Sequence, residues 1–178
     1  MKIKKDTVTF ERNDTIFFDG AIISDGRMAI DTSKVFCFKF KFPDDRLTAA
    51  YIGKQKFTYQ NKQVAVGGDC AWIPNLEAAF SGFKLGEYYE AEITPLQWYD
   101  VHCVASYTAG KFTWLDAGYL PLLQGFDPIV KDDHSPVYAL VAGAPAICIM
   151  PVLISKDPTV QKLTDDLVSV LCAQGGAK

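Results

Sequence analysis

The sequence predicts an all-β fold, mainly an antiparallel β-sandwich or barrel, carrying two helices. Aromatic residues make up 13% of the 178 residues, and many of them recur at every second position, which is the period of a strand. Gly, Asn, Asp and Pro interrupt these runs at short intervals, as turns do. Helix signals occur over residues 74–81 and again over 158–173. We therefore expect a β-rich domain over 1–155, with a C-terminal helix in 156–178 packed on it or on a partner subunit.

Tight turns are predicted in the first part of the chain. Asp19-Gly20 and Asp25-Gly26 flank a short apolar segment, and Asp-Gly pairs supply the positive φ that hairpin turns need. Two such carboxylates could also bind a calcium ion, but the sequence lacks the regularly spaced Asp or Asn ligands and the terminal Glu of a calcium-binding loop. Turns are therefore the favoured interpretation. The strands expected here are Thr7–Glu11 and Thr15–Phe18, and Thr15–Ile30 is interpreted as a tight meander that leads into the Phe-rich stretch.

The most regular alternation lies at Lys34–Phe42, where Phe occupies positions 36, 38, 40 and 42. In one strand all four rings would share a face. Burying a Phe side chain stabilises a fold by about 1.5–3 kcal/mol, so this stretch is predicted to form the centre of the core. Pro43 ends it, and Leu47–Ile52 is predicted as the next strand.

Two hairpins and several further strands complete the predicted sheet. The first hairpin joins Lys56–Tyr59 to Lys62–Val66, and the second joins Tyr99–Tyr107 to Lys111–Leu115 through a turn at 108–110. Residues 116–136 are rich in Gly and Pro and are predicted as a long loop. The remaining expected strands are Glu87–Ile93, which is predicted to stop at Thr94-Pro95, Val137–Ala142 and Ala146–Ile154.

The C-terminal helix is predicted from its start signal and its spacing. Asp157 is a good N-cap and Pro158 fits the first helical turn. Apolar residues then recur at intervals of three and four, which places them on one face. We predict that this face is an interaction surface, formed by Val160, Leu163, Leu167 and Leu171.

Composition argues against several classes of protein. The net charge of −3 and the pI of 5.3 do not suit binding through neutralisation of phosphate groups, so no nucleic-acid partner is expected. The small basic cluster Met1–Lys5 is interpreted as a solvated chain end. No signal peptide is predicted, because no apolar run of about 7–15 residues follows Met1–Lys5. No transmembrane segment is predicted either, because the apolar run Val137–Ile154 contains Pro145 and Pro151. The five cysteines form no Cys-x-x-Cys pair, which favours reduced thiols in the cytoplasm. No cofactor and no membrane partner are predicted.

Cys70 is the sharpest candidate for chemistry. It follows Gly68-Asp69 and precedes the predicted helix at 74–81, and a thiol at a helix N-terminus has a lowered pKa. The order Gly-Asp-Cys, a helix, then a strand carrying His102 loosely resembles papain-like thiol hydrolases of the bacterial cell-wall type. That resemblance implies Cys70 as nucleophile and His102 as base. Residues 71–74 are Ala-Trp-Ile-Pro here, where that family has small residues.

Two acidic groupings are weaker candidates. Asp132, Asp133 and His134 offer three adjacent metal ligands, but adjacent residues seldom suffice without distant partners, and a solvated acidic loop is the favoured interpretation. Glu90 and Glu92 alternate on one face of a predicted strand, a pattern found in glycosidases and also in any strand with a polar face.

No convergent catalytic set emerges from these residues. The leading prediction is therefore a non-enzymatic structural or interaction β-domain that assembles into a homo-oligomer or a larger assembly. Its more specific form is a component of a viral or phage particle that decorates the capsid or associates with the tail. The alternatives are a thiol hydrolase and a glycan or small-ligand binding domain. Exposed tryptophan and tyrosine rings would favour the last.

Overall fold

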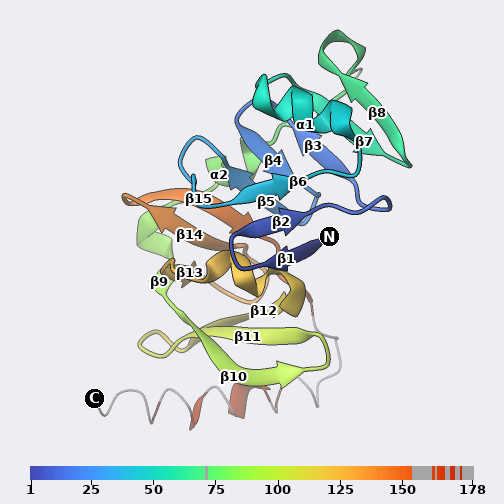
Figure 1. Ribbon diagram of the computed structural model, residues 1–178. Helices are drawn as coiled ribbons and strands as arrows, with labels where there is room; N and C mark the ends of the chain where they lie inside the picture. Colours follow the sequence, from blue (N-terminus) through green and yellow to red (C-terminus); the bar gives the residue numbers. More distant parts are fainter. Residues whose placement is uncertain (71, 154–161, 163, 167–168, 171–172, 174–178) are drawn as a thin grey trace. The chain divides into compact units, whose positions relative to one another are not determined.

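The computed structural model describes all residues except 71, 154–161, 163, 167–168, 171–172 and 174–178 (Figure 1). Strands in antiparallel sheets dominate the described part, with few short helices, so the predicted all-β fold class is confirmed. The chain divides into two compact units. Unit 1 holds Met1–Phe83 and Val141–Cys148, and unit 2 holds Lys84–Leu140 and Ile149–Lys178. The domain boundary predicted at residue 155 stays a prediction.

Unit 1 contains a sheet with the strand order β8-β7-β3-β4-β5-β15 and a smaller sheet β1-β2-β6. The predicted Asp-Gly turns are confirmed, since the Asp19 and Asp25 carboxylates each accept two backbone N–H bonds of their own turn. Those carboxylates therefore hold the turns. The strands are β1 (Lys2–Lys4), β2 (Thr7–Thr9), β3 (Ile16–Phe18), β4 (Ile22–Ser24), β5 (Met28–Asp31), β6 (Lys39–Lys41), β7 (Phe57–Gln60), β8 (Gln63–Val66) and β15 (Ala144–Ile149).

The predicted strand at Leu47–Ile52 is wrong, because this segment belongs to helix α1 (Asp45–Ile52). The Asp44 side chain accepts a hydrogen bond from the Arg46 N–H and so caps the helix. Leu47 and Ala50 are buried three residues apart, which is the helical period. A short apolar run fits either element, and here the cap decides between them.

The Phe-rich stretch forms a much shorter strand than predicted. Only Lys39–Lys41 is extended, as β6, and it pairs in parallel with β2. Backbone bonds from residues 34 and 35 back to the Asp31 carbonyl close a turn just after β5. Phe38 is buried, but Phe36 is 82% exposed. The prediction of four Phe rings on one core face is therefore wrong at Phe36.

The last two rings of that stretch do join an aromatic cluster in unit 1. The Phe42 ring stacks on Phe10 with centroids 5.7 Å apart, and Phe40 stacks on the same ring at 6.5 Å. Tyr51 of α1 lies 5.5 Å from Phe42 and 5.1 Å from Phe18. This cluster links β3, β6, α1 and Phe10, which directly follows β2, so part of the predicted core is confirmed here.

Unit 2 is built around the antiparallel sheet β10-β11-β12, and β14, β13 and β9 are the last three strands in the order of the large sheet that also contains β15. The predicted hairpin with its turn at 108–110 is confirmed. The predicted loop 116–136 contains a 3₁₀ helix, η3 (Ala117–Leu123), and one strand. The strands are β9 (Tyr89–Glu90), β10 (Glu92–Trp98), β11 (Val101–Ser106), β12 (Lys111–Asp116), β13 (Pro128–Val130) and β14 (Val137–Val141).

Strand β10 continues through Pro95, where the sequence predicts an end. Pro95 has no N–H to give to β11. The Thr94 hydroxyl takes over this role, since it donates to the Cys103 carbonyl at 2.9 Å and accepts from the Leu96 N–H at 3.1 Å. The register shifts between Ile93 and Gln97. A side-chain hydroxyl thus carries the strand past the proline.

The helix predicted over 74–81 is confirmed only as the single turn α2 (Ala78–Ser81). In the predicted C-terminal helix, the described residues 162, 164–166, 169, 170 and 173 are helical. The interaction residues predicted there, Val160, Leu163, Leu167 and Leu171, lie outside the described residues. In the described part of the chain, every helix falls short of the length and apolarity that a membrane span requires.

Candidate functional site

Cys70 does not lie at the start of a helix. It follows a 3₁₀ turn, η1 (Gly67–Asp69), and α2 begins only at Ala78. Its Sγ donates to the backbone carbonyls of Ala65 at 3.1 Å and Lys56 at 3.6 Å. The helix dipole on which the predicted activation depended is therefore absent, and the thiol is hydrogen-bonded within its own hairpin.

His102 lies on a strand, as predicted. It is half-buried in β11 of unit 2, paired with Gln97 on one side and Leu115 on the other. Cys103, the next residue, is fully buried on the opposite face of β11, as strand alternation requires. Cys70 belongs to unit 1 and His102 to unit 2. Catalysis by Cys70 and His102 stays a prediction, and no helix dipole supports activation of the Cys70 thiol.

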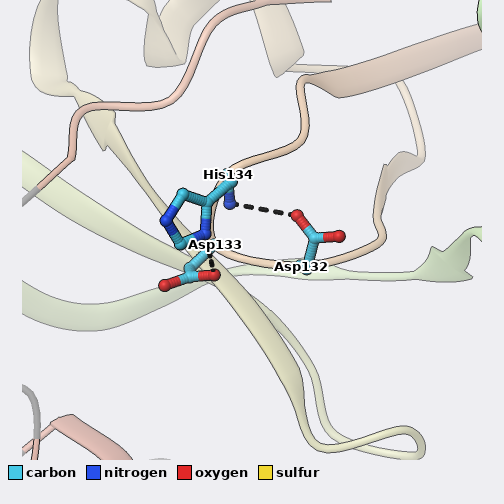
Figure 2. Close-up of side chains that lie close together, drawn as sticks. All are labelled: Asp132, Asp133 and His134. Atoms are coloured by element: carbon cyan, nitrogen blue, oxygen red, sulfur yellow. Dashed lines mark hydrogen bonds and ion pairs between the residues drawn. The ribbon is translucent and has the colours of Figure 1, made fainter.

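The structure brings Asp132, Asp133 and His134 together in a loop that follows β13. One ligand atom from each lies within 4.8 Å of the others. Figure 2 shows the bonds between them: the His134 N–H donates to Asp132 Oδ1 at 3.0 Å, and His134 Nδ1 bonds Asp133 Oδ1 at 2.5 Å. Asp132 Oδ1 also accepts from the Ser135 N–H at 2.7 Å. These contacts hold the loop itself.

The charge of Asp132 is stabilised locally. Burial alone would raise the pKa of this carboxyl, but hydrogen bonds from Ser135 and from the backbone N–H groups of His134 and Ser135, together with the charge of Lys131, lower its pKa. Asp132 therefore stays ionised as the pH falls below the usual Asp range. A metal ion there would compete with N–H donors already in place, and metal binding by these three residues stays a prediction.

An open depression of about 200 Å³ adjoins this loop in unit 2. The β11–β12 hairpin contributes Lys111 and Phe112 to its lining, and Asp165 of the C-terminal helical segment lines it as well. Lys111 introduces a positive charge beside the acidic loop. The depression is mainly polar at its surface, and its mixed charges define no ligand.

Two exposed aromatic residues form the turn end of the β10–β11 hairpin. Trp98 pairs with Val101, so Tyr99 and Asp100 make the turn. Tyr99 is 83% exposed and Trp98 is 41% exposed. Their rings meet edge to face with centroids 5.7 Å apart, and Gln97 Nε2 donates to the Tyr99 carbonyl at 2.8 Å. We call Trp98–Tyr99 the aromatic tip.

Tyr99 also adopts an unusual backbone conformation, with φ of 50°. This left-handed region is readily occupied by Gly, and sometimes by Asn or Asp, but is disfavoured for a bulky side chain. The alternating pattern of the sequence predicts that Tyr99 lies inside a strand, so the tip is not predicted from the sequence. The only available signal is Tyr99-Asp100 between two alternating runs, and no glycine marks the turn.

The three tryptophans have different surroundings. Trp72 in unit 1 is 67% exposed and stands edge-on to the Phe17 ring, with centroids 6.2 Å apart. Trp114 in unit 2 is half-buried and packs on the buried residues Cys103 and Ala105. Trp98 alone lies beside a second exposed ring at a hairpin end. Binding of a glycan or small ligand by these rings stays a prediction.

Comparison of the chain with protein-family models, with curated proteins and with solved structures gives no match. Its function is therefore inferred from the arrangement of its own residues.

Proposed function

We propose that this chain is a non-enzymatic interaction β-domain that assembles with further copies of itself, and that the aromatic tip is one of its contact points. Tyrosine and tryptophan contribute large contact areas and are enriched among the residues that dominate binding energy at interfaces. Trp98 and Tyr99 present two such rings side by side at a hairpin end.

The observation that carries this proposal is the positive φ of Tyr99. Left-handed backbone costs an ordinary residue roughly 1–2 kcal/mol, a cost that Gly avoids. Packing of the Tyr99 side chain within the fold offsets little of this conformational cost, because the side chain is 83% exposed. Strained backbone is concentrated at functional sites, where the side chain is needed outside the fold. Contact with a partner explains why tyrosine occupies this position.

The tip is also held in place before any partner arrives. The Gln97 side chain bonds the Tyr99 carbonyl, and the Trp98 ring packs against the Tyr99 ring. A surface fixed in this way loses less conformational entropy on binding than a free loop does.

Tyr99→Gly separates the strain from the contact. Removing the ring relieves the left-handed backbone, so we expect stability in urea to stay the same or increase while self-association weakens at least tenfold. Light scattering with gel filtration over a concentration series measures the association. Lys62→Gly is the matched control: Lys62 also has a positive φ, 65°, but at the β7–β8 turn. It should increase stability and leave association unchanged.

A wild-type chain that remains monomeric at high concentration would overturn the proposal, as would a Tyr99→Gly variant that associates like wild type. The role in a viral or phage particle is the finer form of the same proposal. It requires that the purified chain form regular particles or decorate them, which negative-stain electron microscopy of concentrated protein tests.

A further inference from the structure

The small sheet of unit 1 has one face built from lysines. Strand β1 pairs with β2, and β2 pairs with β6 (Figure 1). On one face of this sheet, the paired residues form two rows across the three strands. One row reads Lys2, Thr9, Lys41, and the other reads Lys4, Thr7, Lys39. We call the four aligned lysines the lysine face.

The opposite side of the same sheet fixes which way the lysines point. Its middle row is Ile3, Val8 and Phe40. Val8 is fully buried, and Ile3 and Phe40 are half-buried. Because side chains alternate along a strand, the lysines are directed to the outside. All four of them are exposed.

Two of these charges are balanced locally and two are not. Lys2 Nζ pairs with Glu11 at 2.6 Å, and Lys39 Nζ pairs with Asp6 at 3.2 Å. Within the described part of the chain, Lys4 and Lys41 make no ion pair. They lie diagonally across the face, one in each row. The face therefore carries uncompensated positive charge on a chain whose net charge is −3.

Unit 2 exposes the complementary feature. Glu90 ends β9 and Glu92 begins β10, with Ala91 buried between them. Both carboxylates are exposed, and neither makes an ion pair with another described residue. Extended geometry directs them to the same side, about 6–7 Å apart. Tyr89 and Ile93, which flank them, are 43% and 38% exposed.

We propose that the lysine face of one copy binds the Glu90–Glu92 pair of a second copy. Lysines two apart on β1 or β6 repeat at the same 6–7 Å as these carboxylates, so each carboxylate can meet one lysine row. The contact is heterologous, since it joins two different surfaces, and such contacts build rings or linear chains. This inference rests on the proposed function and identifies a second contact in the same self-assembly.

A second copy suits the lysine face better than a nucleic acid or a membrane does. An extended polyanion would meet the net negative charge of the whole chain, and its affinity would depend on releasing many counterions, for which four lysines offer a small number. A pair of carboxylates needs only a local match. Binding to polyanions is treated below as an outcome of the test.

Charge reversal with mixing tests this contact. Lys4→Glu/Lys41→Glu and Glu90→Lys/Glu92→Lys should each weaken self-association at least tenfold at low salt. The first variant has two acidic surfaces and the second has two basic ones, so a one-to-one mixture should associate again. The charge-matched control is Lys56→Glu/Lys62→Glu in the β7–β8 hairpin, which should associate like wild type. Circular dichroism checks folding of every variant, and sedimentation velocity measures association.

The results separate this inference from the proposed function. If both reversal variants associate like wild type while Tyr99→Gly does not, the lysine contact is overturned and the interaction domain stands. If the mixture of reversal variants fails to associate, the pairing is overturned. A third outcome also overturns the pairing. In that outcome the wild type binds anionic vesicles or single-stranded DNA at 150 mM salt, and Lys4→Glu/Lys41→Glu loses that binding but self-associates as the wild type does. A monomeric wild type rejects the proposed function itself.

Discussion

The Sγ of Cys70 donates a hydrogen bond to the carbonyl oxygen of Ala65, 3.1 Å away. Ala65 lies in β8 and Cys70 follows the 3₁₀ turn after it, so the thiol is tied to the hairpin that precedes it in the chain. A thiol bonded in this way is partly shielded, whereas Cys37 is exposed and Cys103 and Cys148 are buried.

Alkylation should therefore follow exposure. With iodoacetamide at neutral pH we expect Cys37 to react first, Cys70 more slowly, and Cys103 and Cys148 only on unfolding. Mass spectrometry of proteolytic peptides over a time course gives each rate. Reaction at Cys70 well ahead of Cys37 would contradict this order and would revive the thiol hydrolase hypothesis, since the attacking species is the thiolate.

Two buried threonines should respond in opposite ways to the loss of a hydroxyl. Thr94→Val removes the hydrogen bond that the Thr94 hydroxyl donates to the Cys103 carbonyl and should destabilise the fold by about 1–3 kcal/mol. Thr113 is fully buried, and its Oγ1 has no hydrogen-bond partner among the described residues. Thr113→Val should therefore be neutral or stabilising. Urea denaturation measures both, with Thr94→Ser as the control that keeps a hydroxyl.

The N-cap of α1 should make stability depend on acid. Hydrogen bonds from the Arg46 side chain and backbone lower the pKa of Asp44 from 3.8 to about 2. A lowered pKa in the folded state means that the contribution of Asp44 is complete above pH 4 and is lost as the pH falls through 2. Asp44→Asn keeps an oxygen that accepts from the Arg46 N–H but does not titrate.

Wild type should therefore lose more stability between pH 4 and 2 than Asp44→Asn does. Thermal or urea unfolding at both pH values, compared between the two proteins, isolates this group from the other carboxylates. Equal losses in the two proteins would show that Asp44 is not responsible.

The Phe-rich stretch should show very different sensitivities at neighbouring phenylalanines. Phe38 is 9% exposed and Phe36 is 82% exposed. Phe38→Ala should cost about 3–5 kcal/mol through the cavity it leaves. Phe36→Ala should change the free energy of unfolding by less than about 0.5 kcal/mol, as most surface substitutions do. A large loss with Phe36→Ala would mean that residues 34–42 form the single buried strand that the sequence predicts.

The sequence predicts those elements that depend only on residues close together in the chain. The hairpin turn near Gly110 follows from residues a few positions apart. The first hairpin is predicted around Gln60-Asn61, and its turn lies one residue later, at Asn61-Lys62, with φ of 50° and 65°. Alternation at 34–42 misleads because the backbone turns back to the Asp31 carbonyl, a contact that alternation does not encode. The Leu47–Ile52 run fits strand and helix alike until the Asp44 cap is weighed.

The candidate surfaces depend on contacts that are still less local. Lys2 and Lys4 are visible in the sequence, as are Lys39 and Lys41, but only the pairing of β2 with both neighbours aligns them. Tyr99 occupies a turn position that its residue type disfavours, so residue preferences alone point away from the aromatic tip. Neither the strained backbone of Tyr99 nor the register of β1, β2 and β6 can be recognised from the sequence alone.

Pro95 has a consequence for how copies of this chain can associate. Strand β10 has β11 as its one neighbour in its described sheet, and a bare strand edge invites fibril growth by backbone pairing. Pro95 lacks an N–H, and the register irregularity around it interrupts the ladder. Growth by strand addition is thus blocked beside the very residues that expose aromatic rings. If copies meet there, as we propose, they would dock through side chains, and such contacts are free to dissociate.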